Sequence, residues 1–120
     1  MIRFTNLVNL LVLLRAFKYS VRGLAYAAKN ERAFQQEIII LAVGVIAAFV
    51  LTASSIERAI LIGSVAVVLL VELINSAIEA TVDRIGPEQH PLSQRAKDLG
   101  SAAVLVSLVS SAVVWLIILV

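Results

Sequence analysis

Three long stretches of the chain are free of charged residues: 38–53, 59–71 and 102–120. The last of these runs for nineteen residues. An α-helix needs about 20 residues to cross the hydrocarbon core of a bilayer, since each residue advances it by about 1.5 Å. With 61% hydrophobic and 15% charged residues among 120, the polar side chains are too few to cover a water-soluble domain. We therefore expect an all-α membrane protein with three membrane-spanning helices.

The same pattern predicts one domain over residues 1–120 and sets the bounds of its parts. These are an N-terminal surface helix over 1–34, spans over 35–54, 56–83 and 98–120, and a loop over 84–97. The second apolar stretch ends at Val71, too early to complete a crossing, so its helix must continue through polar residues. Gly86, Pro87 and Pro91 indicate a true loop, which a short polar helical lead-in joins to the third span.

The N-terminal segment mixes basic and apolar residues, which is typical of amphipathic helices that lie on a membrane surface. A cleavable signal peptide is the alternative, but the apolar run LVNLLVLL is short and no small-residue cleavage site follows it. Lys and Arg number six before the first span, one between the first and second, three before the third and none after it. The positive-inside rule therefore predicts a cytoplasmic N-terminus and a cytoplasmic 84–98 loop.

Composition and motifs exclude several other classes of function. Without cysteine the chain has neither disulfides nor thiolate metal sites. Its net charge is only +2 and no basic tract alternates with aromatic residues, so we expect no nucleic-acid partner. The five glycines form neither a GxxxxGK(S/T) loop nor a GxGxxG turn, which excludes the common soluble nucleotide-binding folds.

The segment VELINSAIEATVDR, residues 71–84, places carboxylates directly after the second apolar stretch. At about 100° per residue, four of its polar residues fall within one narrow stripe of a helix: Glu72, Asn75, Glu79 and Asp83. An ionisable group in hydrocarbon is costly unless it finds a partner, so the stripe must face protein, water or a ligand. The stripe is therefore a candidate functional site.

Oxygen ligands with no cysteine or nearby histidine suit a hard cation such as Mg²⁺, which keeps waters and substrate phosphates in its shell. Further charged residues flank the spans on the expected cytoplasmic side: Glu31, Glu37, Lys97 and Asp98. Together these groups predict a phosphate-and-metal site. Two other interpretations stay open on these residues alone. Glu72 and Asp83 could only hold helices together, by pairing with Lys97, Arg84 or Arg95, or the chain could be a small proton-coupled transporter.

The sequence VELINSAIEATVDRI, followed by HPLSQRAKDLGSAAVLV, closely resembles the signature of the small bacterial integral-membrane diacylglycerol kinases, a family that includes the undecaprenol kinases. The resemblance runs from about Phe17 to the C-terminus. It implies a homotrimer of three-span subunits in the bacterial inner membrane, with a surface helix and active sites between subunits. It also implies transfer of the γ-phosphate of MgATP to the primary hydroxyl of diacylglycerol at the cytoplasmic face, which gives phosphatidic acid. Undecaprenol is the alternative substrate.

The resemblance also implies roles for individual residues. Glu72 corresponds to the general base, and Glu31 and Glu79 correspond to the metal ligands. The ATP-binding positions of the family correspond to Tyr19, Ser20, Glu31, Asn75, Glu79, Glu88, Gln89, His90, Lys97 and Asp98. Those of the lipid-substrate site correspond to Glu37, Glu72 and Ser101.

A few further residues have structural interpretations. We expect Asp83 to pair with a basic residue of the loop and Trp115 to anchor its helix at the outer membrane interface. Hydroxyl residues predict close helix packing in the third span: Ser107, Ser110 and Ser111. Well-known family members carry a basic residue and two tryptophans where this chain has Val12, Val21 and Ala28. Either Arg15 and Tyr26 compensate, or the N-terminal part of the site differs.

Overall fold

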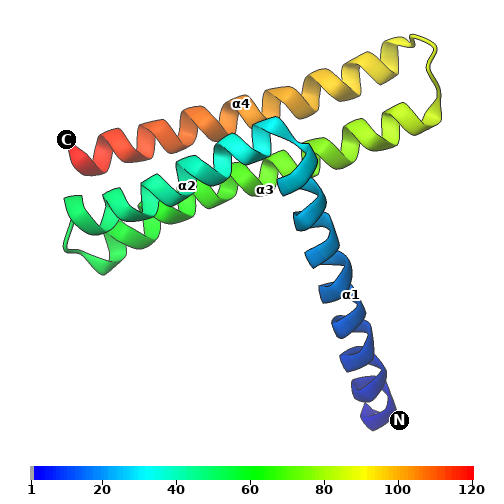
Figure 1. The fold of residues 1–120 in the computed structure, drawn as a ribbon, viewed down its shortest axis with the longest axis horizontal. Coiled ribbons are helices and arrows are strands. Elements are labelled where there is room, and N and C mark those ends of the chain that lie inside the picture. The colour runs from blue at the N-terminus through cyan, green and yellow to red at the C-terminus, as the bar shows by residue number, and fades with distance from the viewer. Residues whose placement is uncertain (1) are drawn as a thin grey trace. The chain divides into compact units, whose positions relative to one another are not determined.

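The computed structural model describes the backbone from Ile2 and the side chains from Asn9 to the C-terminus. The chain forms four helices: α1 (Ile2–Asn30), α2 (Arg32–Leu51), α3 (Ser55–Ile85) and α4 (Pro91–Leu119) (Figure 1). Within the described residues all regular structure is helical, which confirms the predicted all-α class. The helices α2, α3 and α4 are each long and apolar enough to cross a membrane, as the charge-free stretches predict.

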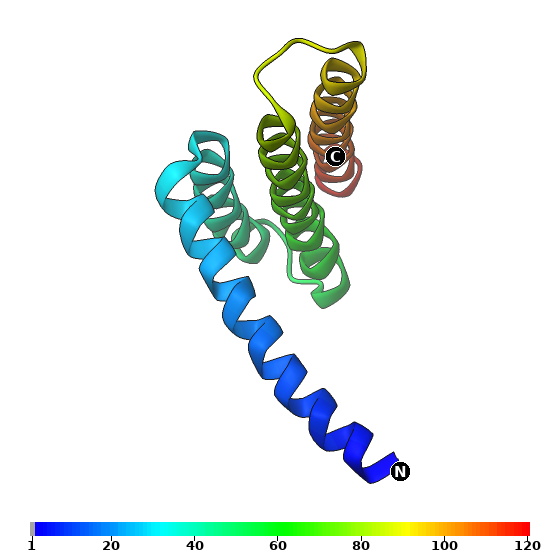
Figure 2. The same ribbon diagram turned by 90° about the vertical axis from the view of Figure 1, so that its right-hand side faces the viewer.

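The chain divides into two compact units, residues 1–35 and 36–120, which are described separately below. The first unit contains α1 and the first residues of α2. In the second unit the rest of α2 runs alongside α3 and α4, and successive helices alternate in direction (Figures 1 and 2). The backbones of α3 and α4 lie near each other over a longer stretch than those of any other pair of described helices. The second unit is therefore a bundle of three antiparallel helices.

A short turn joins α2 to α3 and supplies hydrogen-bond partners at the ends of both helices. Ser54 is the N-cap of α3, where its side chain accepts from the Glu57 N–H. Arg58 reaches back to the end of α2: its Nε donates to Thr52 O at 2.9 Å, and its Nη2 donates to Phe49 O at 3.2 Å. The last carbonyls of a helix have no N–H partner within the helix, and hydrocarbon cannot donate hydrogen bonds to them. The Arg58 guanidinium supplies these donors instead.

The helix α4 begins at Pro91, inside the segment 84–97 that was predicted to be a loop. Only residues 86–90 separate α3 from α4, and the expected polar lead-in forms the first turns of α4 itself. His90 is the N-cap of α4, and its Nδ1 accepts from the Leu92 N–H at 3.1 Å. Pro91 takes the first helical position, where a missing N–H is of no consequence. The polar residues after the cap therefore lengthen α4 beyond its apolar part.

Hydroxyl side chains lie where α3 and α4 pack together. Ser64 of α3 and Ser111 of α4 share a hydrogen bond of 3.0 Å. Ser107 and Ser111 are buried, which confirms the predicted close packing at these two positions. Ser110 is exposed in the isolated chain.

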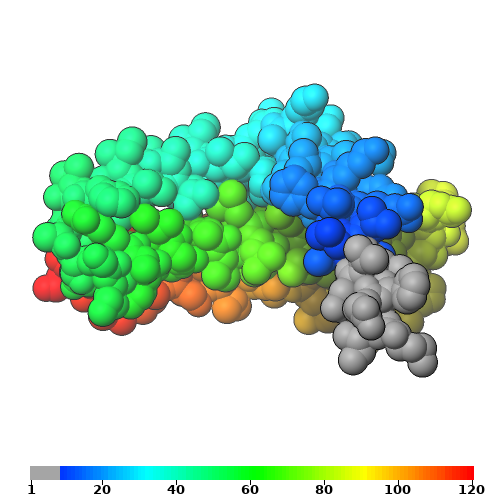
Figure 3. All heavy atoms as spheres, turned by 90° about the horizontal axis from the view of Figure 1, so that it is seen from below, coloured from blue at the N-terminus to red at the C-terminus, as the bar shows by residue number. Residues whose placement is uncertain are grey.

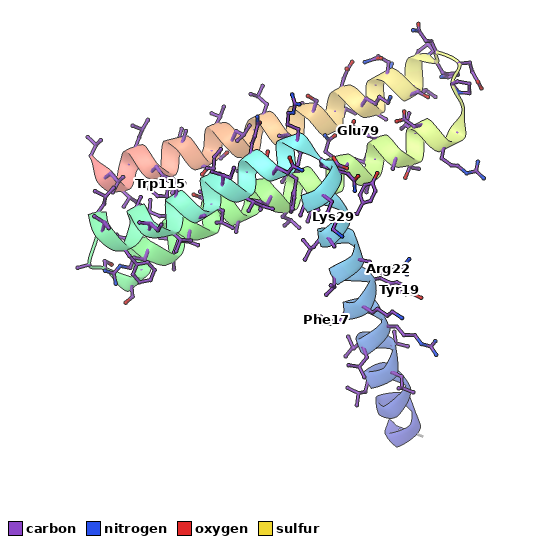
Figure 4. The ribbon with its side chains drawn as sticks, in the orientation of Figure 1. Phe17, Tyr19, Arg22, Lys29, Glu79 and Trp115 are labelled. Atoms are coloured by element: carbon purple, nitrogen blue, oxygen red, sulfur yellow. The ribbon has the colours of Figure 1, made fainter. Side chains whose placement is uncertain are left out.

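Trp115 packs against the other helices of the bundle, while its predicted place at the outer membrane interface stays a prediction. Its indole Nε1 donates to the Leu61 carbonyl of α3 at 3.2 Å (Trp115 is labelled in Figure 4). Its ring lies beside Gly44 of α2, where an added Cβ would be 3.4 Å from the indole Cζ2. An indole N–H inside a protein needs such an acceptor. Trp115 thus connects α4 to both other helices of the bundle.

Large apolar side chains cover the outside of the second unit. On α4, Leu105, Val106 and Ile117 are 61%, 63% and 73% exposed. In the space-filling view of Figure 3, atoms of α2 and α3 lie side by side over one continuous face. Water-soluble monomers rarely expose contiguous apolar patches of this extent. The surface is suited to lipid as its solvent.

Candidate active site

The polar stripe of α3 lies as the helical period predicts. Glu72 and Asn75 are buried, with 6% and 8% of their surface exposed, whereas Glu79 and Asp83 are exposed. Asn75 Nδ2 donates to Glu79 Oε1 at 2.8 Å. The stripe therefore changes along α3 from buried to open, and the Asn75 amide fixes one oxygen of the Glu79 carboxylate.

Gly100 of α4 packs directly against Asn75. A Cβ at position 100 would overlap Asn75 Oδ1, so only glycine lets the two helices approach this closely here. Asn75 Oδ1 is buried and accepts no hydrogen bond from the described residues. The Asn75 amide is thus held between the backbone of α4 and the Glu79 carboxylate.

A salt bridge joins the two helices beyond this point. Lys97 Nζ of α4 lies 2.7 Å from Asp83 Oδ1 of α3. The predicted pairing of Asp83 with a basic residue is therefore confirmed, although its partner belongs to α4 and not to the loop. The side chains are 39% and 66% exposed, so solvent screens the pair and it contributes little to the stability of the fold. Its main effect is to hold the Lys97 ammonium at the open end of the stripe.

A pocket of about 820 Å³ opens around this salt bridge and the α3–α4 loop. Four of the predicted ATP-binding residues line it together with Asp83: Glu88, Gln89, His90 and Lys97. The capping hydrogen bond uses His90 Nδ1, which leaves Nε2 for other partners. Asp98 does not line the pocket; its Oδ1 accepts from Gln94 Nε2 at 2.9 Å. The structure thus brings a cation and several polar groups from separate segments to one cavity.

Glu37 of α2 lies at the level of Glu72. A Cβ on Gly44 would be 3.8 Å from the Val65 side chain, and this contact fixes the register of α2 against α3. Glu37 is about two turns before Gly44, and Glu72 is about two turns after Val65, so the antiparallel helices carry both carboxylates to one level. Glu37 is 6% exposed, and Glu72 is close enough to act on it electrostatically.

Ser101 is the third predicted lipid-site residue, and in the single chain it does not face Glu37 and Glu72. It is exposed on α4. It follows Gly100, which faces Asn75, and its side chain therefore points about 100° away around the helix.

The remaining predicted residues belong to the first unit. Tyr19 is 61% exposed, with the Arg22 guanidinium carbon 5.9 Å from its ring centroid. Ser20 Oγ donates to the Ala16 carbonyl at 2.9 Å. Glu31 stands between α1 and α2, in the first unit, whereas Glu79 belongs to the second. Within the described part of the chain no three His, Asp or Glu side chains gather into one metal-binding cluster.

Sequence reasoning did not identify Gly100 as part of this arrangement. The available signal was a glycine three positions after Lys97, on the part of α4 that faces the stripe. Gly44 was missed in the same way, although it lies beside Trp115 and sets how closely that indole approaches α2.

Comparison with known proteins identifies the family of the chain. Residues 18–119 match the family model of the prokaryotic diacylglycerol kinases. The chain is 49% identical over 107 residues to a diacylglycerol kinase of Escherichia coli (strain K12), covering 89% of this chain and 88% of that protein. It is 46% identical over 116 residues to one of Pseudomonas aeruginosa, covering 97% and 94%. A diacylglycerol kinase of Haemophilus influenzae is 46% identical over 103 residues, covering 86% and 87%.

The bundle of three potential membrane spans with a carboxylate stripe, taken together with these matches, defines the class as a bacterial membrane kinase. The chain belongs to the prokaryotic diacylglycerol kinase family. The family membership therefore favours an enzyme over a proton-coupled transporter.

Proposed function

We propose that this chain phosphorylates the primary hydroxyl of diacylglycerol with ATP and so forms phosphatidic acid at the cytoplasmic membrane face. The observation that carries the proposal is the position of Glu72, which is buried in a helix long enough to span the membrane. Glu72 lies one turn from the Asn75–Glu79 hydrogen bond and on the same face of α3. A proton acceptor at membrane depth thus adjoins groups that suit a phosphate and its counter-ion. The family membership and the names of the relatives support the same substrate.

Glu72 acts in this proposal as the general base. Its carboxylate accepts the proton of the lipid hydroxyl while the hydroxyl oxygen forms a bond to the γ-phosphorus, and the bond from that phosphorus to the ADP oxygen breaks. Burial keeps water away from the carboxylate, which favours transfer to the lipid over hydrolysis of ATP.

Mg²⁺ is the metal that the donor set suits best. Glu79 offers a hard carboxylate whose orientation the Asn75 amide fixes, and Glu31 is the second proposed ligand. Few protein ligands are needed, because Mg²⁺ usually takes substrate phosphates and waters as its remaining ligands. When bound, the ion would offset the negative charge of the phosphates.

The loop pocket is the proposed nucleotide site. Lys97 supplies a cation for the phosphates, and Glu88, Gln89 and His90 supply polar groups above them. Asp98, the residue after Lys97, does not line this pocket in the single chain, and its carboxylate is proposed to accept from donors of the ribose or base. Tyr19 and Ser20 are proposed as contacts from α1.

We further propose a homotrimer with active sites between subunits and a cytoplasmic N-terminus. On α1, Tyr19 and Arg22 project from one side and Phe17 from the opposite side (Figure 4). Arg15 and Lys18 lie within about 60° of Arg22 around the same helix. This division of basic and apolar residues suits a helix at the surface of an anionic leaflet.

The test is phosphoryl transfer by the purified protein in mixed micelles. Label from the γ-phosphate of MgATP should appear in phosphatidic acid, and chelation of the divalent metal should abolish the reaction. A parallel reaction with undecaprenol measures the alternative substrate. The proposal fails if diacylglycerol is not phosphorylated, or if undecaprenol has the higher kcat/KM.

A further inference from the structure

Two buried carboxylates lie at one level on neighbouring helices of the bundle. Glu37 of α2 and Glu72 of α3 are each 6% exposed, and Glu72 is close enough to act on Glu37 electrostatically. Both helices are long and apolar enough to cross a membrane. A carboxylate in such surroundings loses its hydration, and a second carboxylate nearby repels it. The pair therefore needs a positive charge or a proton between its members.

The three-helix bundle supplies no basic side chain at this level. Lysine, arginine and histidine are absent from three of its segments, all of which the structure describes: 33–51, 59–83 and 98–120. Along α3 the nearest basic residues are Arg84 and Arg58, about 18 and 21 Å from Glu72 at about 1.5 Å per residue. Lys97 of α4 pairs with Asp83, about 16 Å along α3 from Glu72. A proton is therefore the charge with which the bundle itself can balance the two carboxylates.

The hydrogen bonding of Glu37 indicates which residue carries that proton. Glu37 Oε2 is buried and accepts no hydrogen bond from the described residues. Nothing described here donates to a negative charge on this oxygen, and buried polar atoms normally have a partner. A protonated oxygen needs an acceptor instead, and the Glu72 carboxylate at the same level can be one. Glu72 must in turn be ionised to act as a general base.

We propose that Glu37 is protonated in the resting protein and donates a hydrogen bond to the ionised Glu72, which positions Glu72 as the base. The inference rests on the proposed function and adds a positioning residue to it. Glu72 takes the hydroxyl proton while the hydroxyl oxygen bonds to the γ-phosphorus and the bond to the ADP oxygen breaks, so the pair then holds two protons. One proton passes to water at the open end of the stripe, and the pair returns to a single proton.

A hydrogen bond from a neutral partner to a carboxylate favours the ionised form of that carboxylate. Such bonds are also short and directional, so they fix the orientation of the acceptor. Glu37 thus provides two things that a lone carboxylate at membrane depth lacks. It keeps Glu72 ionised without adding a second negative charge, and it holds one oxygen of Glu72 in place.

Infrared difference spectra of the purified protein in lipid test the two protonation states directly. Glu37→Gln should remove the carbonyl band of a protonated carboxyl group, which shifts when H₂O is replaced by D₂O. Glu72→Gln should remove the bands of an ionised carboxylate and shift the Glu37 band, because the acceptor has changed. Glu57→Gln is the matched control at the α2–α3 turn, where Glu57 Oε1 accepts from Thr52 Oγ1. It should leave the protonated carboxyl band in place.

Three spectral outcomes would overturn the inference. Carboxylate bands lost in both Glu37→Gln and Glu72→Gln would mean that a cation offsets two ionised groups, whether a bound ion or a basic residue of the first unit or of a second chain. Protonated bands lost in both variants would leave no ionised base. A protonated band lost only in Glu72→Gln would place the proton on the wrong member of the pair.

Two neutral substitutions of similar size separate positioning from packing. Glu37→Gln keeps a hydrogen-bond donor for Glu72, whereas Glu37→Leu removes it and suits the apolar surroundings, so both variants should fold. We expect kcat of Glu37→Gln to exceed that of Glu37→Leu about tenfold or more, with similar KM for diacylglycerol. A direct contact between Glu37 and the lipid would instead separate the two variants in KM. Equal kcat values, or a difference confined to KM, would contradict the positioning role.

The spectra need no turnover, so they separate this inference from the proposed function. If the wild-type chain phosphorylates no diacylglycerol, the proposed function has failed, and the role of Glu72 as base has failed with it. If the wild-type chain is active but the spectra show Glu37 ionised, only the shared proton has failed. A protonated Glu37 band in an active wild type, together with the kcat difference between Glu37→Gln and Glu37→Leu, is the result that we expect.

Discussion

Gly100 of α4 and Asn75 of α3 touch so closely that no side chain fits between them. The contact matters because Asn75 also donates to Glu79, the proposed metal ligand. The backbone of α4 therefore helps to position a carboxylate on α3 that it does not itself touch. A single methyl group at position 100 is enough to test this relationship.

Gly100→Ala should lower both stability and activity. The added Cβ must displace Asn75 Oδ1 or push α4 away, and overpacking of this kind costs about 1–3 kcal/mol. A shift of Asn75 also releases the Glu79 carboxylate, so we expect turnover to fall about tenfold to a hundredfold. Thermal unfolding in detergent and phosphoryl transfer measure the two effects. Gly63→Ala is the matched control, since the added Cβ meets no neighbouring side chain or helix of the described residues within 4 Å. It gains the same helix propensity as Gly100→Ala, so it should raise stability slightly and leave activity unchanged. Normal activity in Gly100→Ala would mean that the Asn75 amide is not held by this packing.

Glu72→Gln should separate chemistry from binding. The amide keeps the shape of the side chain but cannot accept the hydroxyl proton, so kcat should fall about a hundredfold or more with little change in ATP affinity. Glu79→Gln should instead raise the Mg²⁺ concentration needed for half-maximal rate. Titrations of rate against MgATP and free Mg²⁺ distinguish the two variants. Near-normal turnover of Glu72→Gln at saturating substrates would remove Glu72 from the role of base.

The Lys97–Asp83 salt bridge should matter for nucleotide binding more than for stability. The pair is exposed and screened by solvent, so Asp83→Asn should leave the thermal unfolding of the protein in detergent nearly unchanged. Lys97→Met removes the cation that lines the loop pocket and should raise the KM for ATP about tenfold or more, with Asp83→Asn clearly less affected. If the two variants raise the KM equally, the salt bridge itself is what the site requires, and Lys97 acts only through it.

The sequence predicted those features that depend on spacing along one helix. The three spans follow from the charge-free stretches, and the stripe of Glu72, Asn75 and Glu79 follows from the helical period. Both are properties of local sequence, so no knowledge of tertiary packing was needed. The end of the loop was predicted less well, because the capping hydrogen bond of His90 starts α4 at Pro91.

Features that depend on the packing of one helix against another were not predictable in this way. Gly100 meets Asn75 only because of the register between α3 and α4, and a glycine within an apolar helix gives no sign of its neighbour. The hydrogen bond from the Trp115 N–H to the Leu61 carbonyl likewise joins two helices, and the spacing of residues along α4 gives no sign of it. An apolar groove lined by residues of α2, α3 and α4 also exists only once the three helices are packed together.

The final prediction concerns sites shared between subunits. Glu72, Asn75 and Glu79 belong to one helix, whereas Lys97 and Asp98 belong to α4 and Glu31 to the first unit. If one active site takes these groups from more than one chain, two inactive variants altered in different segments should restore some activity in mixed trimers. Glu72→Gln and Asp98→Asn are the pair to combine, and the recovered activity should follow the statistical fraction of sites with both intact parts. Glu72→Gln mixed with Glu79→Gln is the matched control, because both changes lie on α3 and no site can then be complete. If no pairing recovers activity although differently tagged chains are pulled down together, each chain builds its active site alone.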